Sequence, residues 1–215
     1  MVTIAPTVIP TTITPGITKA LGSLVPNACL QFVPVRPMPG ASRNKCVFNV
    51  REAVDRFGGQ LVFGWAVALW PKVLLDCIGH AVLRTPDGLL CVTPPQYEEE
   101  RLLFAEDPSL SFDFDDPQAR MPHKFIPLSK DPWVIKLINI EEELLKLQIQ
   151  LPRMSGPVEV AGRLGWEIQQ LQHQRIEAVR RVVLRTRELN DPCVCQSGRK
   201  FRKCCRPAMF AAGPY

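Results

Sequence analysis

The sequence predicts an α+β protein: a small antiparallel-sheet body with one N-terminal helix, followed by a helical hairpin and a C-terminal cysteine-rich knuckle. Three observations support this prediction. Residues 25–128 hold short apolar segments separated by proline and glycine, residues 131–189 hold two long stretches with apolar residues three and four apart, and four of the eight cysteines lie in residues 193–205. The first pattern is typical of strands and turns, and the second is typical of amphipathic helices.

Residues 1–24 precede the body and differ from it in composition. They are rich in threonine, proline and isoleucine, and Lys19 is their one charged residue. β-Branched residues between prolines favour an extended chain over a helix. We therefore expect residues 1–24 to form a flexible, extended arm.

The body at 25–128 is expected to contain one helix and several strands. The segment "NVREAVDRFGG" predicts a helix that ends at its two glycines. Strands are predicted at 30–36, in "QLVFGWAVALWP", and on either side of the turn "TPDG". A further hairpin is expected in "RLLFAEDPSLSFDF", with its turn at Asp107 and Pro108.

Two long helices are predicted in residues 131–189. The first opens with Asp131 as its cap and Pro132 at its first position, and the second runs over about 157–189. A short turn between two such helices makes an antiparallel hairpin. The knuckle at 190–206 follows the long second helix, and this position predicts a projecting recognition tip.

The net charge of +5 is unevenly distributed. Residues 98–116 hold eight acids against one base, whereas residues 175–206 hold ten bases against three acids. A basic end suggests contact with phosphate or with an acidic protein surface. No apolar run approaches the roughly 18 residues that span a membrane, and no secretory signal is evident. We expect a cytoplasmic protein without membrane contact, whose thiols are free or metal-bound.

The cysteine spacing in "DPCVCQSGRKFRKCC" predicts a metal site. Two thiols stand at each end of an eight-residue loop, at Cys193, Cys195, Cys204 and Cys205. Zinc takes four tetrahedral ligands, which two close pairs of thiols can supply. The cations nearby favour the thiolate form that a metal requires.

The same stretch resembles the SEC-C motif, whose general form is C-P-C-G-S-G-K-K-Y-K-x-C-C/H. Besides the four cysteines, Ser197, Gly198, Lys200 and Lys203 match, and Phe201 stands where the family often has Tyr. The departures are Val194 for Pro and Gln196 for Gly. The resemblance implies a zinc ion bound by Cys193, Cys195, Cys204 and Cys205. It also implies a protein or ribonucleoprotein partner, because the motif of the bacterial preprotein translocase motor contacts a chaperone and the ribosome.

The body carries a second candidate site, formed by Cys46 and His80. Cys46 opens the predicted helix, where the helix dipole and Lys45 would lower the pKa of a thiol. His80 lies on a later predicted strand. The order of a helix-terminal cysteine followed by a strand histidine is that of papain-type and transglutaminase-type hydrolases.

The string "GHAVLRTPDGLLCVTP" resembles the histidine strand and following strand of transglutaminase-like domains. The body also resembles uncharacterised phage and bacterial domains found beside SEC-C motifs. Cys91 stands where those hydrolases would have an acid, so Asp76 and Asp87 are the candidates for a third catalytic member. A metal site formed by Cys77, His80 and Cys91 is a further alternative.

Three interpretations of function remain open. The first is a zinc-binding adaptor module for a protein or ribonucleoprotein partner. The second is a thiol hydrolase or acyltransferase that uses Cys46 and His80, with the knuckle as its targeting tail. The third is a nucleic-acid binder that uses the basic C-terminal region, although no aromatic stacking platform is visible there.

Overall fold

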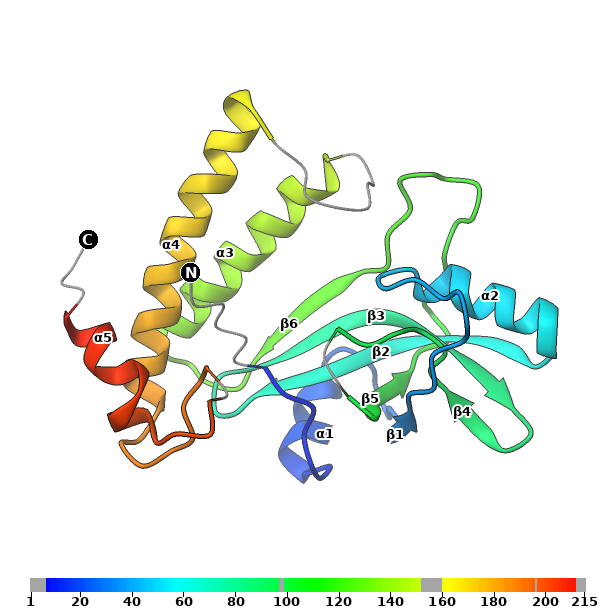
Figure 1. Cartoon of the computed structure of the whole chain (residues 1–215), viewed down its shortest axis with the longest axis horizontal. Coiled ribbons are helices and arrows are strands. Elements are labelled where there is room, and N and C mark those ends of the chain that lie inside the picture. Colours follow the sequence, from blue (N-terminus) through cyan, green and yellow to red (C-terminus); the bar gives the residue numbers. More distant parts are fainter. Residues whose placement is uncertain (1–6, 97–98, 152–159, 196, 212–215) are drawn as a thin grey trace. The chain divides into compact units, whose positions relative to one another are not determined.

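The computed structural model describes residues 7–96, 99–151, 160–195 and 197–211. It confirms an α+β protein with an antiparallel sheet and a C-terminal cysteine cluster (Figure 1). The helices are α1 (Pro15–Leu21), α2 (Cys46–Phe57), α3 (Pro132–Ile149), α4 (Gly162–Thr186) and α5 (Cys205–Ala211), with a 3-10 turn, η1, at Phe201–Lys203. The strands are β1 (Leu30–Pro34), β2 (Gln60–Trp70), β3 (Leu74–Thr85), β4 (Gly88–Leu90), β5 (Arg101–Glu106) and β6 (His123–Pro127).

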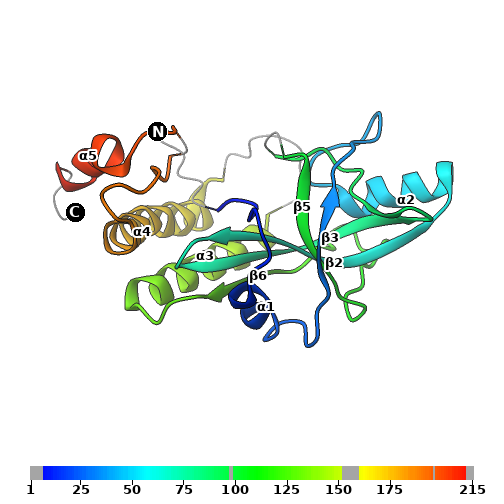
Figure 2. The same ribbon diagram turned by 90° about the horizontal axis from the view of Figure 1, so that it is seen from below.

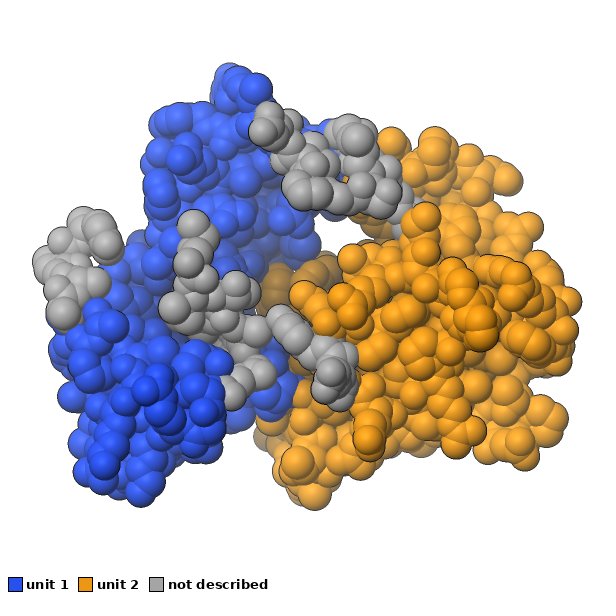
Figure 3. All heavy atoms as spheres, in the orientation of Figure 1, with its two compact units in different colours: residues 1–8, 70–74, 127–215 blue, residues 9–69, 75–126 orange. Residues whose placement is uncertain are grey.

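The chain divides into two compact units, which Figure 3 colours separately. Unit 1 comprises residues 1–8, 70–74 and 127–215, and unit 2 comprises residues 9–69 and 75–126. The sequence predicts the helical hairpin and the knuckle as separate segments, and the structure holds both in unit 1.

Unit 2 is built on the sheet, whose strand order is β1-β5-β2-β3-β4, with β6 paired to β3. An isolated bridge between Val35 and Cys91 joins the segments that follow β1 and β4, so the two ends of the strand order meet and the sheet closes on itself. Closure satisfies backbone groups that would otherwise stand at open edges. The residues that share the apolar cluster inside this closed sheet are Val33, Val62, Val82, Cys91, Leu102 and Phe104.

Helix α2 packs on the other face of the same sheet. Val47, Val50 and Ala53 are buried on the helix against Ala81 and Leu83 of β3. Residues 81 and 83 alternate with residue 82, which lies in the other cluster, as the two-residue period of a strand requires. The helix ends before Gly58, which has a positive φ of 75° and donates to Val54 O.

The N-terminal arm is a correction to the sequence prediction. Residues 15–21 form the helix α1 rather than an extended chain. Thr14 caps the helix by accepting from Ile17 N, and Pro15 occupies its first turn. Proline at the start of a helix loses no hydrogen bond there, so this proline favours a helix start instead of breaking a helix. Ile17 and Leu21 are then buried in unit 2.

The hairpin expected in residues 101–114 is also a correction. Strand β5 pairs with β1 and β2, and residues 110–114 form no strand. The side chain of Asp107 accepts from Trp65 Nε1 (2.8 Å) and from Ser109 N (3.0 Å), which turns the chain after β5. Strand β6, which pairs with β3, is not predicted by any pattern in the sequence.

Unit 1 contains the helical hairpin, in which α3 and α4 lie side by side (Figures 1 and 2). Asp131 at the start of α3 pairs with Arg185 near the end of α4. Glu141, later in α3, pairs with Arg175, earlier in α4, so the helices are antiparallel, as predicted. Asp131 caps α3 by accepting from Trp133 N. The buried residues of the pair are Val134, Leu137, Ile138, Ile140 and Leu144 on α3 and Ala178, Val179, Val182 and Val183 on α4.

No helix in the described part of the chain combines the length and the apolar character needed to cross a membrane.

Candidate metal centre

The knuckle folds by bringing the two ends of a short loop together. Pro192 and Lys200 form an antiparallel bridge, and Cys193 N donates to Arg199 O (2.9 Å). Gly198 has a φ of 73°, a backbone region that glycine adopts without strain. The turn η1 follows, and Cys205 is then the first residue of α5.

This fold makes the four cysteines of the motif converge. The sulfur atoms of Cys193, Cys195, Cys204 and Cys205 all lie within 4.8 Å of one another, and those of Cys195 and Cys204 are 3.5 Å apart. Bonds of about 2.3 Å from one tetrahedral zinc ion would place its sulfurs about 3.8 Å apart. The donor set therefore fits a single tetrahedral metal ion with thiolate ligands.

The protonation of these thiols is uneven. The hydroxyl of Ser197 lies 3.3 Å from the sulfurs of both Cys195 and Cys204. Its hydrogen bond is the main cause that lowers the pKa of Cys195 to about 6. Burial raises the pKa of Cys205. Binding of a metal to thiolates would therefore displace protons from the cluster.

The knuckle is packed into unit 1, which differs from the projecting tip that its position predicts. Phe201 is 1% exposed, and Val194 is also buried. Phe201 N donates to Asp191 O (2.8 Å), and Arg202 N donates to Leu189 O (3.0 Å). These bonds tie the second half of the loop to the segment that leaves α4. This packing is not predicted from the sequence, because the motif does not specify which residues contact its aromatic ring.

The histidine of the body meets a thiol, that of Cys91. His80 Nε2 lies 3.3 Å from Cys91 Sγ. Strand β4 pairs with β3 in a register that sets Leu83 opposite Leu90. If this register is extended by one residue, Cys91 lies opposite Val82. His80 is then the diagonal neighbour of Cys91 on the same face of the sheet. Cys46 is the first residue of α2, as predicted, and packs beside the apolar cluster under that helix.

This pair is held in its uncharged form. Burial, with a smaller contribution from the nearby Cys46, raises the pKa of Cys91 to about 11, although a hydrogen bond to the backbone of Thr93 acts to lower it. Burial lowers the pKa of His80 to about 4. A neutral thiol beside a neutral imidazole is the reverse of the thiolate–imidazolium pair of an activated cysteine nucleophile.

The other candidates lie apart from His80. Asp76 Oδ1 is 2.6 Å from His123 Nε2, on the neighbouring strand β6, and Asp87 lies in the turn between β3 and β4. Cys77 is buried, and burial raises its pKa to about 12. Among the described residues, the knuckle is the one group of three or more metal-ligating side chains that converge.

Comparison with known proteins identifies the knuckle. The family model of the SEC-C motif matches residues 190–207, a small part of the chain. No curated protein and no solved structure gives a significant match. The resemblance of the body to transglutaminase-like domains therefore stays a prediction, and the chain carries a SEC-C motif with a metal-binding cluster of four cysteines.

Proposed function

We propose that this protein is a zinc-binding adaptor whose C-terminal knuckle docks on an anionic partner, either a protein or a ribonucleoprotein. Zinc is proposed because four thiolates in a tetrahedral arrangement are typical of structural zinc sites. The observation that carries the docking role is the distribution of paired and unpaired cations along unit 1.

The five arginines of α4 (Gly162–Thr186) each contact a carboxylate of the hairpin, and two of them share Glu177. The pairs are Arg163–Glu167, Arg175–Glu141, Arg180–Glu177, Arg181–Glu177 and Arg185–Asp131. Much of the basic charge that the sequence shows in residues 175–206 is therefore not available to a partner.

The cations of the knuckle loop differ from these arginines because they have no carboxylate partner in the described part of the chain. Arg199, Lys200, Arg202 and Lys203 are exposed, and none forms an ion pair within the described residues. A group of four unpaired cations on a metal-held loop supports docking on phosphates or carboxylates. Phe201 is buried and cannot stack on a nucleobase, so recognition through this loop would be electrostatic.

The test is binding of the zinc-loaded protein to two labelled polyanions, a poly-glutamate peptide and a single-stranded RNA, over a series of salt concentrations. We expect one or both to bind at low salt and to lose affinity steeply as salt rises. Replacing all four loop cations by glutamine should weaken binding more than about tenfold at low salt.

The matched control neutralises cations that already have partners. Arg163→Gln and Arg175→Gln should leave binding nearly unchanged, because both side chains are engaged with Glu167 and Glu141. The proposal fails if neither polyanion binds at low salt, or if the quadruple variant binds as the wild type does. Binding of the peptide alone would favour a protein partner, and binding of RNA would favour a ribonucleoprotein.

A Cys46/His80 hydrolase is the second candidate, supported by the position of Cys46 at the N-terminus of α2, where the helix dipole stabilises negative charge. The uncharged state of the neighbouring His80–Cys91 pair favours the adaptor.

A further inference from the structure

Arg180 of α4 connects the helical hairpin to the last helix of the knuckle. Its Nη1 donates to the backbone carbonyl of Met209 in α5 (2.8 Å). Its Nε and Nη2 donate to the two carboxylate oxygens of Glu177 (2.8 and 3.1 Å). The side chains of Arg180 and Glu177 are 12% and 23% exposed, so this contact is shielded from most of the solvent.

Glu177 extends the connection across the hairpin. It also accepts from Arg181 Nε (2.6 Å), and the guanidinium of Arg181 lies 5.5 Å from the ring centre of Trp133 in α3. The hydrogen bond from Arg180 is the main cause that lowers the pKa of Glu177, so the carboxylate is ionised at neutral pH. The network therefore runs from Met209 through Arg180, Glu177 and Arg181 to α3.

The position of Met209 depends on a metal ligand. Cys205 is the first residue of α5, and Met209 follows it by one helical turn. A metal that fixes the sulfur of Cys205 would fix the start of α5 and, with it, the Met209 carbonyl that Arg180 contacts. Met209 itself is buried, so α5 is also packed by an apolar side chain.

The chain between α4 and the knuckle gives little freedom for separate movement. Asp191 Oδ2 accepts from Glu188 N (3.0 Å), and residues of η1 donate to the carbonyls of Leu189 and Asp191. Lys72 Nζ also contacts Glu188 (3.3 Å). The knuckle is thus hydrogen-bonded at its entrance and at α5, on either side of the cysteine cluster.

We propose that Arg180 is a latch through which metal binding at the knuckle stabilises the C-terminal half of α4. The inference rests on the metal site of the proposed function. It adds that the stability of the C-terminal half of α4 depends on whether that site holds a metal ion. Loss of the metal would release α5 and remove the Met209 acceptor from Arg180. Coupling free energies are reciprocal. If a bound metal strengthens the contact between Arg180 and Met209, then loss of that contact must weaken metal binding by the same free energy.

The test is hydrogen exchange of the full chain, measured by mass spectrometry with zinc bound and after chelation. In the wild type, chelation should reduce the protection of residues 175–186 as well as that of the knuckle. In Arg180→Met, which keeps an unbranched apolar side chain and removes the guanidinium, residues 175–186 should show the same protection with and without zinc.

The reciprocal test is a chelator-competition titration of zinc. Arg180→Met should bind zinc about 5- to 100-fold more weakly than the wild type. Arg180→Lys retains the charge without the planar fork that reaches Glu177 and Met209 together, so it should fall between the two. If Arg180→Met fails to fold, Arg180→Lys provides the test of the latch in its place.

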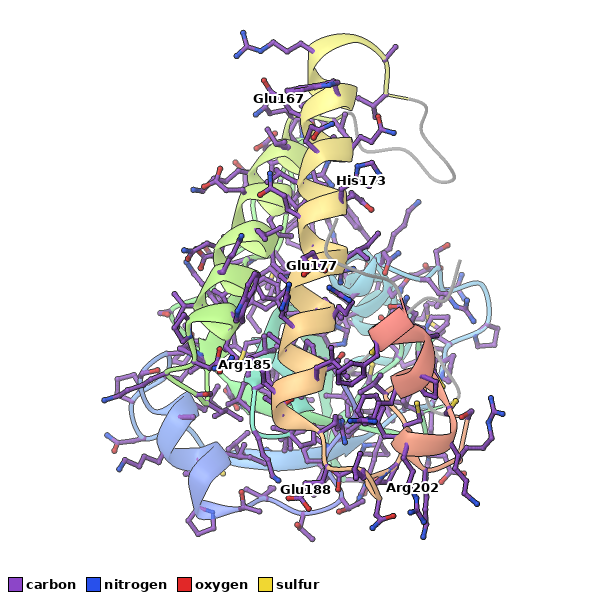
Figure 4. The ribbon with its side chains drawn as sticks, turned by 90° about the vertical axis from the view of Figure 1, so that its left-hand side faces the viewer. Glu167, His173, Glu177, Arg185, Glu188 and Arg202 are labelled. Carbon is purple, nitrogen blue, oxygen red and sulfur yellow. The ribbon has the colours of Figure 1, made fainter. Side chains whose placement is uncertain are left out.

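Arg163→Met is the matched control, because it removes an arginine–glutamate pair at the other end of α4, where Figure 4 labels Glu167. It should leave both measurements unchanged. A chain that takes up no zinc overturns the latch together with the metal site. The latch alone is overturned if zinc binds to Arg180→Met with the affinity of the wild type. It is also overturned if chelation leaves the hydrogen-exchange protection of residues 175–186 in the wild type unchanged.

Discussion

The knuckle and the body each bring thiols into contact with other side chains, and the two environments have opposite effects. In the knuckle, four sulfurs converge beside the Ser197 hydroxyl, and the pKa of Cys195 falls to about 6. In the body, burial raises the pKa of Cys91 to about 11 and keeps its neighbour His80 uncharged. The comparison shows that a hydrogen bond from a hydroxyl favours the thiolate of Cys195, whereas burial beside an uncharged imidazole keeps the thiol of Cys91 protonated.

The two regions also differ in what holds them together. The closed sheet of unit 2 has a cluster of fully buried residues that includes Val33, Val82 and Phe104. The knuckle buries few large side chains, chiefly Val194, Phe201 and Met209. A segment with so small an apolar core would gain much of its stability from a metal ion bound by its four cysteines.

The largest expected effect is that of Phe201→Ala, which removes the main apolar side chain of the knuckle. Truncation of a buried phenylalanine costs about 3–5 kcal/mol of folding free energy, which is a large fraction of the stability that such a small segment can have. Zinc should be lost to a chelator at a much lower concentration than in the wild type, as measured with a colorimetric zinc indicator.

Phe210→Ala is the control for this prediction. Phe210 is 57% exposed, in the same helix α5, with Arg206 over its ring. The chelator concentration for zinc release should be close to that of the wild type. Equal effects of the two substitutions would contradict the view that the knuckle has a core of its own.

The knuckle was predictable from sequence because its ligands are close along the chain. The spacing predicts Cys193, Cys195, Cys204 and Cys205 as ligands, since two close pairs of thiols at the ends of a short loop supply the four ligands that zinc takes. The packing of Phe201 and the bond from Arg180 to Met209 join segments distant in sequence, so no local pattern could reveal them.

A second prediction concerns pH and the body. The pKa of His80 is lowered from an ordinary 6.5 to about 4, so the unfolded chain binds this proton first as pH falls. The stability that the neutral imidazole contributes is complete above pH 6.5 and is lost between pH 6.5 and 4, by about 3 kcal/mol. Urea unfolding followed by tryptophan fluorescence at several pH values measures it.

His80→Asn should reduce that acid-dependent loss, while His173→Asn, at an exposed position of α4, should leave it unchanged. An identical pH profile for wild type and His80→Asn would show that His80 is not buried as an uncharged group.

A third prediction concerns thiol reactivity at neutral pH, which leaves the stability of the fold unchanged. Cys91 should react with iodoacetamide far more slowly than the exposed Cys29, because it is buried and mostly protonated. Peptide mapping by mass spectrometry gives both rates. If Cys46 instead reacts faster than Cys29, and His80→Ala slows it, the hydrolase interpretation is favoured.

The body was less predictable than the knuckle, for a physical reason. The turn "TPDG" predicted the β3–β4 hairpin, and its register implies that His80 and Cys91 share a face. Strand β6 and the pairing of Asp76 with His123 depend on contacts between segments almost fifty residues apart. The prolines around residue 15 predict an extended chain, but the position of Pro15 directly after the cap Thr14 makes it the start of helix α1.

The metal centre itself is tested most directly by native mass spectrometry of the intact chain, expressed with zinc in the medium. The wild type should carry one zinc ion, and Cys204→Ser, which removes one of the four converging sulfurs, should lose it or bind it far more weakly. His80→Ala, in the body, should retain the ion. A wild-type protein whose mass is that of the metal-free chain, or a Cys204→Ser variant that keeps its ion, would contradict the assignment of the knuckle as the metal site.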